Sequence, residues 1–575
     1  MAETLLSPGV LARENDQSFI QGQPVERGAA LIGPSTKGPV EIPTIVGSFS
    51  EYTAVFGGSV ESGSNLYSYF NSIAASNYFQ NGGNSLLVTR VTSGSFSPAV
   101  SSTIATGSGG PTDGLSPFVL ETISEGEIMN TGTALLSGGA LATGSSDNIR
   151  WEIAGVNTSS GTFSLLIRRG DDTTNSKIVV EQYNNLSLDP YSSNYISKVI
   201  GDVDHTLVND GSDYYIQESG SYANASRFVR VKQVNYNTPR YFDNTGTAKS
   251  EFTGYLPVVG SGSFNGAVGS NIPTGRAANY YNNISSADSQ GLEGTDYTNA
   301  ISLMSNVDEY KYNVIAVPGL LNSEHSTQIT SIVNNTIARG DSISVIDLVK
   351  YNTAIATAIT QAAGFDSSYA ATYWPWLQTI DPNIGEQVWI PASTMIPGVY
   401  AFTDASSDPW FAPAGITRGG LGQVTRAERK LSAGNRDDLY EANINPIATF
   451  PQSGVVVFGQ KTLQKRASAL DRINVRRLLI SLKSFISQIA DNLVFEQNSA
   501  STRNNFLSQV NPYLESVQQR QGLYAFKVVM DDTNNTPDVV DRNELIGQIF
   551  IQPTRTAEYI MLDFNVLPTG ATFPA

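Results

Sequence analysis

The sequence predicts a multidomain fold that combines α/β and α+β parts, with a β-rich insertion and an extended arm at each end. Three observations support this prediction. At 575 residues the chain is long enough for about four domains of roughly 150 residues each. Short β-branched apolar runs alternate with helical segments near both ends of the chain. A long stretch rich in Ser, Thr, Gly and Asn separates these two regions.

The N-terminal part is predicted to contain an arm followed by the first piece of a core. Residues 1–22 have too few apolar residues to form a core, so we expect an extended arm. Residues 23–90 are predicted to be the first part of the core. They hold short apolar runs bounded by Gly and Pro, typical of buried strands, and a helix that starts at Ser50 and Glu51 and stops at Gly57. Residues 65–83 read as a second helix.

The middle of the chain, residues 91–300, is predicted to be a variable, β-rich, protruding insertion. Alternating runs at 163–170, 177–183 and 227–234 read as strands joined by long polar loops. The stretch carries 11 basic and 20 acidic residues. A polar, acidic block of this kind most simply forms a solvated outer surface.

Residues 301–430 are predicted to be the second, α/β part of the core. A strand near 310–320, a helix over 323–341 and a strand at 342–348 form a βαβ pattern with parallel strands and a right-handed crossover. Ser323 or Asn322 is expected to cap this helix, close to His325. Residues 353–364 read as a further helix, and 364–378 as a segment that passes from helix to loop.

Residues 431–575 are predicted to be a C-terminal domain that ends in a linking strand. The stretch 462–497 carries one apolar stripe at three- and four-residue spacing and reads as a long helix. Residues 504–522 read as a second helix, 523–532 as a strand, and 556–567 as the terminal strand.

The composition excludes several classes of function. The formal charge of −17 disfavours wrapping of nucleic acid, whose affinity comes from Lys and Arg on phosphates. The chain has no cysteine, which excludes thiolate metal sites, disulfides and cysteine nucleophiles. Only two histidines, His205 and His325, are present. The N-terminus lacks a signal-peptide pattern, and no window is apolar enough for a membrane span, so we expect a cytoplasmic chain without cofactor or membrane insertion.

Short motifs that resemble chemical sites have simpler interpretations. In the 33–39 stretch, GPSTKGP, Lys37 precedes Gly38 and is followed by Pro39 and a strand, which excludes a P-loop and predicts a turn. The 201–205 stretch, GDVDH, is read as a loop rather than a metal site. The 531–538 stretch has Pro537 where a calcium loop needs Gly. The aromatic run at 373–377 is expected to pack in a core or interface rather than to bind sugar.

One charged segment has two interpretations that the sequence does not separate. Between Arg418 and Lys483 there are 12 basic and five acidic residues, a charge of +7 within a chain of −17. The segment is either a solvated helix face or a positive surface for an acidic partner.

The order of these features resembles the contractile tail sheath proteins of myovirus-type phages, a family related to pyocin and type VI secretion sheaths. The resemblance covers residues 1–90 and 300–575. It rests on SPGV at 7–10, AALIGPSTKGP at 29–39, YFQNGG at 78–83, YWPWL at 373–377, the 390–415 stretch and INVRRLLISL at 473–482.

The resemblance implies a tail-sheath core of mixed sheets with helices, and a structural polymer rather than an enzyme. Such subunits stack as hexameric rings around a tail tube and contract to drive the tube through the bacterial envelope. The partners implied are further copies of the chain, the tube protein, and the baseplate and tail terminator proteins. The implied location is the virion, after assembly in the host cytoplasm.

The resemblance also implies two sets of functional residues. Terminal arms of the family add strands to a neighbour's sheet. The linking residues expected here are Ser7, Pro8, Gly9, Val10, Tyr559, Ile560, Met561, Leu562 and Phe564. The basic residues expected to face an acidic tube are Lys461, Lys465, Arg466, Arg472, Arg476 and Arg477, unless Arg476 and Arg477 form intramolecular ion pairs.

A second hypothesis stays open at this stage. The polar, β-rich middle and the aromatic run also suit a secreted or surface carbohydrate-binding or hydrolytic protein. The missing signal peptide and the lack of a convincing catalytic pair count against it.

Overall fold

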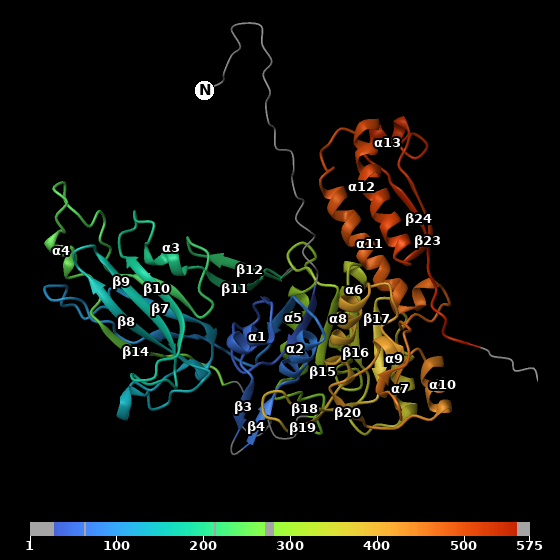
Figure 1. Ribbon diagram of the computed structural model, residues 1–575, viewed down its shortest axis with the longest axis horizontal. Helices are drawn as coiled ribbons and strands as arrows, with labels where there is room; N and C mark the ends of the chain where they lie inside the picture. The colour runs from blue at the N-terminus through green and yellow to red at the C-terminus, as the bar shows by residue number, and fades with distance from the viewer. Residues whose placement is uncertain (1–27, 63–64, 212–213, 271–280, 561–575) are drawn as a thin grey trace, which may run out of the picture.

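The computed structural model describes residues 28–62, 65–211, 214–270 and 281–560. Figure 1 shows three bodies in this part of the chain: a central core, the insertion at the left, and a helical C-terminal domain that projects at the upper right. The fold mixes helices and several sheets, as predicted.

The core is built on one eight-stranded sheet. Its inner strands are parallel, and the two edge strands are antiparallel to their neighbours. In spatial order the strands are β2 (Thr44–Val46), β5 (Leu86–Arg90), β1 (Ala29–Gly33), β15 (Val314–Leu321), β16 (Ile343–Asp347), β17 (Ala370–Trp374), β21 (Asn445–Phe450) and β22 (Gly454–Val457). The two distant parts of the sequence therefore form a single sheet, which continues beyond residue 430.

Helices cover both faces of this sheet, which explains why its central strands are buried along their whole length. One face packs against α1 (Phe49–Phe56), α2 (Phe70–Gln80) and α8 (Ile396–Ser406). The other packs against α5 (Thr298–Leu303), α6 (Ser326–Arg339), α7 (Ile355–Ala362) and α10 (Ala433–Glu441). The predicted βαβ unit is confirmed, since β15 and β16 are parallel and α6 connects them.

Smaller elements complete the core. The strands β18 (Leu377–Ile380), β19 (Gln387–Ile390) and β20 (Val424–Ala427) form a separate antiparallel sheet. The strands β3 (Ser59–Ser62) and β4 (Asn65–Ser68) form a hairpin, and α9 (Gly415–Arg418) is a single turn.

Several local predictions for the core are wrong. The residue that caps α1 is Ser48, whose hydroxyl accepts from the Glu51 amide at 3.1 Å, because the helix already begins at Phe49. The helix predicted from residue 65 begins only at Phe70, after β4. Neither Ser323 nor Asn322 caps α6, because the helix begins after His325, which makes no capping bond through its side chain. The 364–378 segment holds strands β17 and β18 rather than helix and loop.

The insertion is a seven-stranded antiparallel sheet with its own hydrophobic core. The alternating runs predicted as strands correspond to β9, β10 and β13. In spatial order the strands are β10 (Val179–Ser187), β9 (Thr162–Arg169), β8 (Ile149–Asn157), β14 (Gly260–Asn265), β6 (Pro98–Ser101), β7 (Phe118–Glu125) and β13 (Val229–Val234). The short helices α3 (Ile196–Ile200) and α4 (Ser250–Thr253) pack on this core, whereas the hairpin of β11 (Asp204–Asn209) and β12 (Tyr214–Ser219) packs against the α5 side of the main core.

The C-terminal domain is a helical hairpin that packs against a β-hairpin. The elements are α11 (Ile473–Asp491), α12 (Ala500–Gln519), β23 (Leu523–Val529), α13 (Pro537–Asp541) and β24 (Gln548–Pro553). The predicted apolar stripe packs in this core through Leu478, Leu482 and Ile489.

The long helix begins at Ile473 rather than at 462, and residues 462–472 hold only a 3-10 turn at Ala469–Asp471. Strand β24 was not predicted, and residues 556–560 of the predicted terminal strand are not in a strand; its remaining residues lie outside the described ranges. None of the helices in the described ranges is both long and apolar enough to span a bilayer.

Candidate assembly site at the junction of the core and the C-terminal domain

The basic segment singled out from the sequence lies where the core meets the C-terminal domain. After β22 the chain passes Gln460 and Lys461 and reaches Arg472, the N-cap residue of α11. Residues 461 and 472 form a β-bridge, which brings the two ends of this connection together. The chain returns to the same place after β24, so three separate segments meet here.

Arg472 does not extend into solvent as a free cation. Its guanidinium contacts Glu558 in a bidentate pair, at 2.7 Å from Nε and 3.0 Å from a terminal nitrogen, and also pairs with Asp471 at 3.1 Å. Glu558 accepts two further hydrogen bonds, from the Gln460 amide and the Tyr440 hydroxyl, each at 3.0 Å. Burial opposes ionisation of this carboxyl, but the hydrogen bonds from Arg472, Gln460 and Tyr440 outweigh it and lower the pKa of Glu558. The carboxylate is therefore charged at neutral pH.

Arg476 and Arg477 are buried, with exposed fractions of 4% and 5%. The Arg477 guanidinium pairs with Asp404 of α8 and lies 4.6 Å from the ring centre of Tyr400. The Arg476 guanidinium lies 3.9 Å from the ring centre of Tyr369 and donates to the Ser368 hydroxyl. For Arg477 this is the intramolecular pairing considered above as the alternative to a contact with the tube.

The remaining basic candidates differ in exposure. Lys461 is half-buried, and its ammonium donates to the Tyr440 carbonyl at 2.7 Å. Burial lowers the pKa of Lys461. Lys465 and Arg466 are exposed, although the Lys465 ammonium also donates to the Ala363 carbonyl. The six residues therefore do not form one exposed basic face, and Lys465 and Arg466 are the two that solvent reaches most freely.

The residues expected to link subunits are only partly described. Tyr559 and Ile560 are exposed, at 76% and 77%. The others, namely Ser7, Pro8, Gly9, Val10, Met561, Leu562 and Phe564, lie outside the described residues.

The β-hairpin of the C-terminal domain was missed by sequence reasoning as a candidate site. Strands β23 and β24 form a two-stranded sheet, and no other strand of the described residues pairs with either. One face packs on the helices through Phe526, Ile549 and Ile551. Tyr524 and Phe550 are exposed. The short apolar run of Ile549, Phe550 and Ile551 between two glutamines was the available signal.

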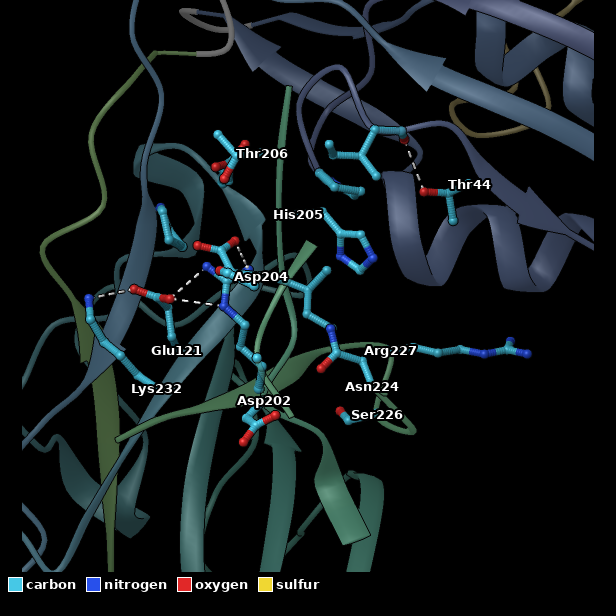
Figure 2. Close-up of a pocket in the computed structure, with 18 of the residues that line it drawn as sticks. Thr44, Glu121, Asp202, Asp204, His205, Thr206, Asn224, Ser226, Arg227 and Lys232 are labelled. Atoms are coloured by element: carbon cyan, nitrogen blue, oxygen red, sulfur yellow. Dashed lines mark hydrogen bonds and ion pairs between the residues drawn. The ribbon is translucent and has the colours of Figure 1, made fainter. Parts of the chain in front are cut away.

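A separate groove lies between the core and the insertion. It has a volume of about 1240 Å³ and is lined by residues 39–45 of the core and by β11 and β13 of the insertion. Figure 2 shows charged side chains of this groove, among them Glu121, Asp204 and Lys232. Arg230 pairs with Glu121 and Asp204, and Lys232 pairs with Glu121.

His205 also lines this groove and lies 3.2 Å from Glu218. Across the residues that the structure describes, no three acidic or imidazole side chains are placed to hold a metal ion.

The aromatic run at 373–377 is buried, as the packing interpretation predicted. Trp374 and Trp376 are 2% and 3% exposed. The Trp376 indole donates to the Val349 carbonyl at 2.9 Å, and its ring contacts Phe70 and Tyr351 edge-on. These rings have no open face for a sugar.

Comparison with known proteins identifies the domains on the two sides of the junction. Residues 290–463 match the model of the phage tail sheath protein central domain, and residues 466–567 match the model of the phage tail sheath C-terminal domain. These matches show that the two stretches carry domains of the phage tail sheath family. The boundary between the two matches falls between Lys461 and Arg472, in the connection described above.

Individual sheath proteins show the same relationship. The tail sheath protein of Vibrio phage KVP40 is 38% identical over 216 residues, which cover 38% of this chain and 32% of the relative. That of Enterobacteria phage T4 is 37% identical over 230 residues, covering 40% and 35%. The matches thus span about a third of the length of these curated relatives.

A crystal structure of a sheath tail protein from Listeria innocua has the same fold. Its TM-score is 0.51 at 11% identity, over 92% of this chain and 95% of that one.

Proposed function

We propose that the chain is a structural subunit of a contractile phage tail sheath. In this role it polymerises as stacked hexameric rings around a tail tube and contracts to drive the tube through the bacterial envelope. The observation that carries the proposal is that the central and C-terminal domains of the sheath family occupy consecutive stretches of the chain. Contraction requires a subunit with two stable arrangements, and a junction between two domains is a natural place for such a change.

The partners proposed are other copies of the chain, the tail tube protein, and the baseplate and tail terminator proteins. The protein acts mechanically within the virion, after assembly in the host cytoplasm. It needs no catalytic residue, cofactor, nucleic acid or stable membrane insertion for this work.

Subunits are proposed to be linked through strands added in trans. The hairpin of β23 and β24 offers the acceptor, because no described strand pairs with its edges. Unpaired edges bind extended segments through main-chain hydrogen bonds and normally have to be protected from such pairing. The donors are the 1–22 arm, with Ser7, Pro8, Gly9 and Val10, and the terminal segment, with Tyr559, Ile560, Met561, Leu562 and Phe564. The insertion is proposed to protrude from the polymer.

Electron microscopy of the purified chain at rising concentration, with and without residues 1–22, tests the linkage. Rings or hollow tubes that form from the full chain and vanish after truncation support it. Polymers that persist without the arm contradict it. If the full chain polymerises only after tail tubes are added, the sheath assembles on a template, and the truncation is then compared on tubes.

Contact with an acidic tube is proposed for the exposed members of the basic segment. Lys465 and Arg466 are both exposed, and polar contacts of this kind are screened by salt, so they can hold an extended state and still be released. The double variant Lys465→Glu and Arg466→Glu is expected to weaken assembly on tubes and to leave tube-free polymers intact. Lys311→Glu, which reverses the charge of an exposed side chain in the core, is the matched control. Unchanged tube binding by the double variant would contradict the proposal.

A further inference from the structure

The C-terminal segment is attached to the rest of the protein at few points. After β24, the Thr554 amide donates to the Gly522 carbonyl at 3.1 Å. Arg555 and Ala557 are exposed. The next attachments are Thr556 and Glu558, and Tyr559 and Ile560 beyond them are again exposed. Figure 1 shows this segment as the red trace that leaves β24 and passes toward α10.

Glu558 is bound by groups from three different segments. The Arg472 guanidinium donates two hydrogen bonds, and the Gln460 amide and the Tyr440 hydroxyl donate one each. Gln460 also donates to the Thr556 hydroxyl at 2.6 Å. We call Tyr440, Gln460, Arg472 and Glu558 the Glu558 clamp. Bidentate, charge-assisted pairs of this kind have a well-defined geometry, so the clamp fixes the direction in which the chain leaves the domain.

The clamp connects the two family domains. Tyr440 and Gln460 belong to the matched central domain, whereas Arg472 and Glu558 belong to the matched C-terminal domain. The four hydrogen bonds to the Glu558 carboxylate form together only in one relative arrangement of α10, the loop after β22 and the start of α11. A rotation of one domain against the other separates these donors.

The clamp is strong enough to hold the segment and accessible enough to open. The side chains of Arg472 and Glu558 retain exposed fractions of 25% and 18%, so water can replace the partners of both when they separate. A fully buried pair would instead be left without solvation and would resist opening.

We propose that the Glu558 clamp is a reversible latch: it fixes the C-terminal segment while the two domains keep this arrangement, and it opens when they rotate. Opening frees residues 555–560, which extends the link to the neighbouring subunit by up to about 20 Å at roughly 3.3 Å per residue. The opening step and the longer link rest on the proposed sheath function, whereas the fixing of the C-terminal segment concerns the single chain. Glu558 is thus a positioning residue for the link, and the latch explains how a link of fixed residue number accommodates two spacings of subunits.

The first experiment uses the monomer and trypsin, which cleaves after Arg555. Glu558→Gln removes the charge at nearly constant size, and we expect the cleavage that yields fragments 1–555 and 556–575 to accelerate at least tenfold. Glu515→Gln, an exposed change on α12, is the matched control and leaves the rate unchanged. Tyr440→Phe removes one hydrogen bond and gives an intermediate rate, in a variant that keeps its packing. Equal rates in the wild type and both clamp variants would overturn the latch.

The second experiment locks the latch in assembled sheaths. Because the chain contains no cysteine, Gln460→Cys and Thr556→Cys introduce a unique pair that a reducible bismaleimide can join. Locked tails are expected to assemble in the extended state and to fail to shorten fully under mild urea, with shortening restored by reductant. Full shortening of locked tails overturns the release step. If the wild-type chain never polymerises, the proposed function fails and the release step fails with it, whereas the trypsin result still decides whether the clamp holds the segment.

Discussion

The ammonium group of Lys37 donates to the main-chain carbonyl of Asp147 at 3.1 Å, across 110 residues of sequence. Lys37 lies in the turn after β1, in the core, and Asp147 lies just before β8, in the insertion. The Asp147 carboxylate is 3.9 Å from the same ammonium. Burial lowers the pKa of Lys37 and raises that of Asp147, while their mutual attraction opposes both shifts. The lysine of the GPSTKGP turn thus joins two bodies of the protein.

Lys37→Met is expected to destabilise the attachment of the insertion to the core. The substitution leaves the Asp147 carbonyl without its donor and removes the charge that faces the Asp147 carboxylate, at a cost of roughly 1–3 kcal/mol. Differential scanning calorimetry is expected to show a lower melting temperature. The control Lys177→Met removes an exposed partner of Glu152, which costs about 0–1 kcal/mol. Equal shifts in the two variants would show that Lys37 does not hold the bodies together.

Arg477→Ala is expected to destabilise the fold far more than Arg466→Ala. The first removes the buried guanidinium that pairs with Asp404 and lies over the Tyr400 ring, at a cost of about 3–5 kcal/mol. The second removes an exposed side chain and is expected to cost less than about 0.5 kcal/mol. Urea unfolding of both variants measures the difference. If the Arg477→Ala variant is stable but fails to bind tubes, Arg477 contacts the tube instead.

The stability of the core is expected to fall as pH rises from about 4 to about 7, through Asp347. Burial raises the pKa of this carboxyl, at the end of β16, from 3.8 to about 7, although hydrogen bonds from Ser393 favour the charged form. The folded state therefore keeps a proton that the unfolded chain has lost. Stabilisation is complete below pH 4 and disappears through pH 7, a change of about 4 kcal/mol. Asp347→Asn keeps a donor and an acceptor for Ser393 and is expected to flatten this dependence in melting curves.

The insertion is expected to fold by itself. Its sheet encloses a separate hydrophobic core, and Ser97 and Val268 form a β-bridge at its base, so its two ends lie together. A fragment of residues 97–268 is expected to unfold cooperatively, with β-type circular dichroism. A fragment that binds hydrophobic dyes and melts without a transition would contradict this.

The βαβ unit and the helical hairpin could be predicted because their patterns are local. The run 343–347 is rich in β-branched apolar residues, and the stripe on α11 repeats at helical spacing. Strand β17 could not be recognised in the same way. Both of its faces are buried, so it shows no alternation, and its two alanines favour a helix in isolation. Tertiary pairing with β16 and β21 decided the outcome.

The roles of the basic residues depend on partners that are distant in sequence. Arg477 is buried because Asp404 and Tyr400 of α8 lie opposite it, and Arg472 is occupied because the chain returns at Glu558. A count of positive charges predicts the net charge of a segment. It does not predict which of these cations form ion pairs inside the fold. The sequence alone could identify the basic segment, but it could not identify which of its residues are exposed.

The bridge between Ser97 and Val268 allows the insertion to be replaced as one module. The bridge brings the two ends of the insertion together, while the eight-stranded sheet is completed by residues on both sides of the insertion. Exchange of the whole module at this base preserves the strand register of the sheet and the junction near Glu558. The same core can therefore carry different modules at this position, including foreign domains.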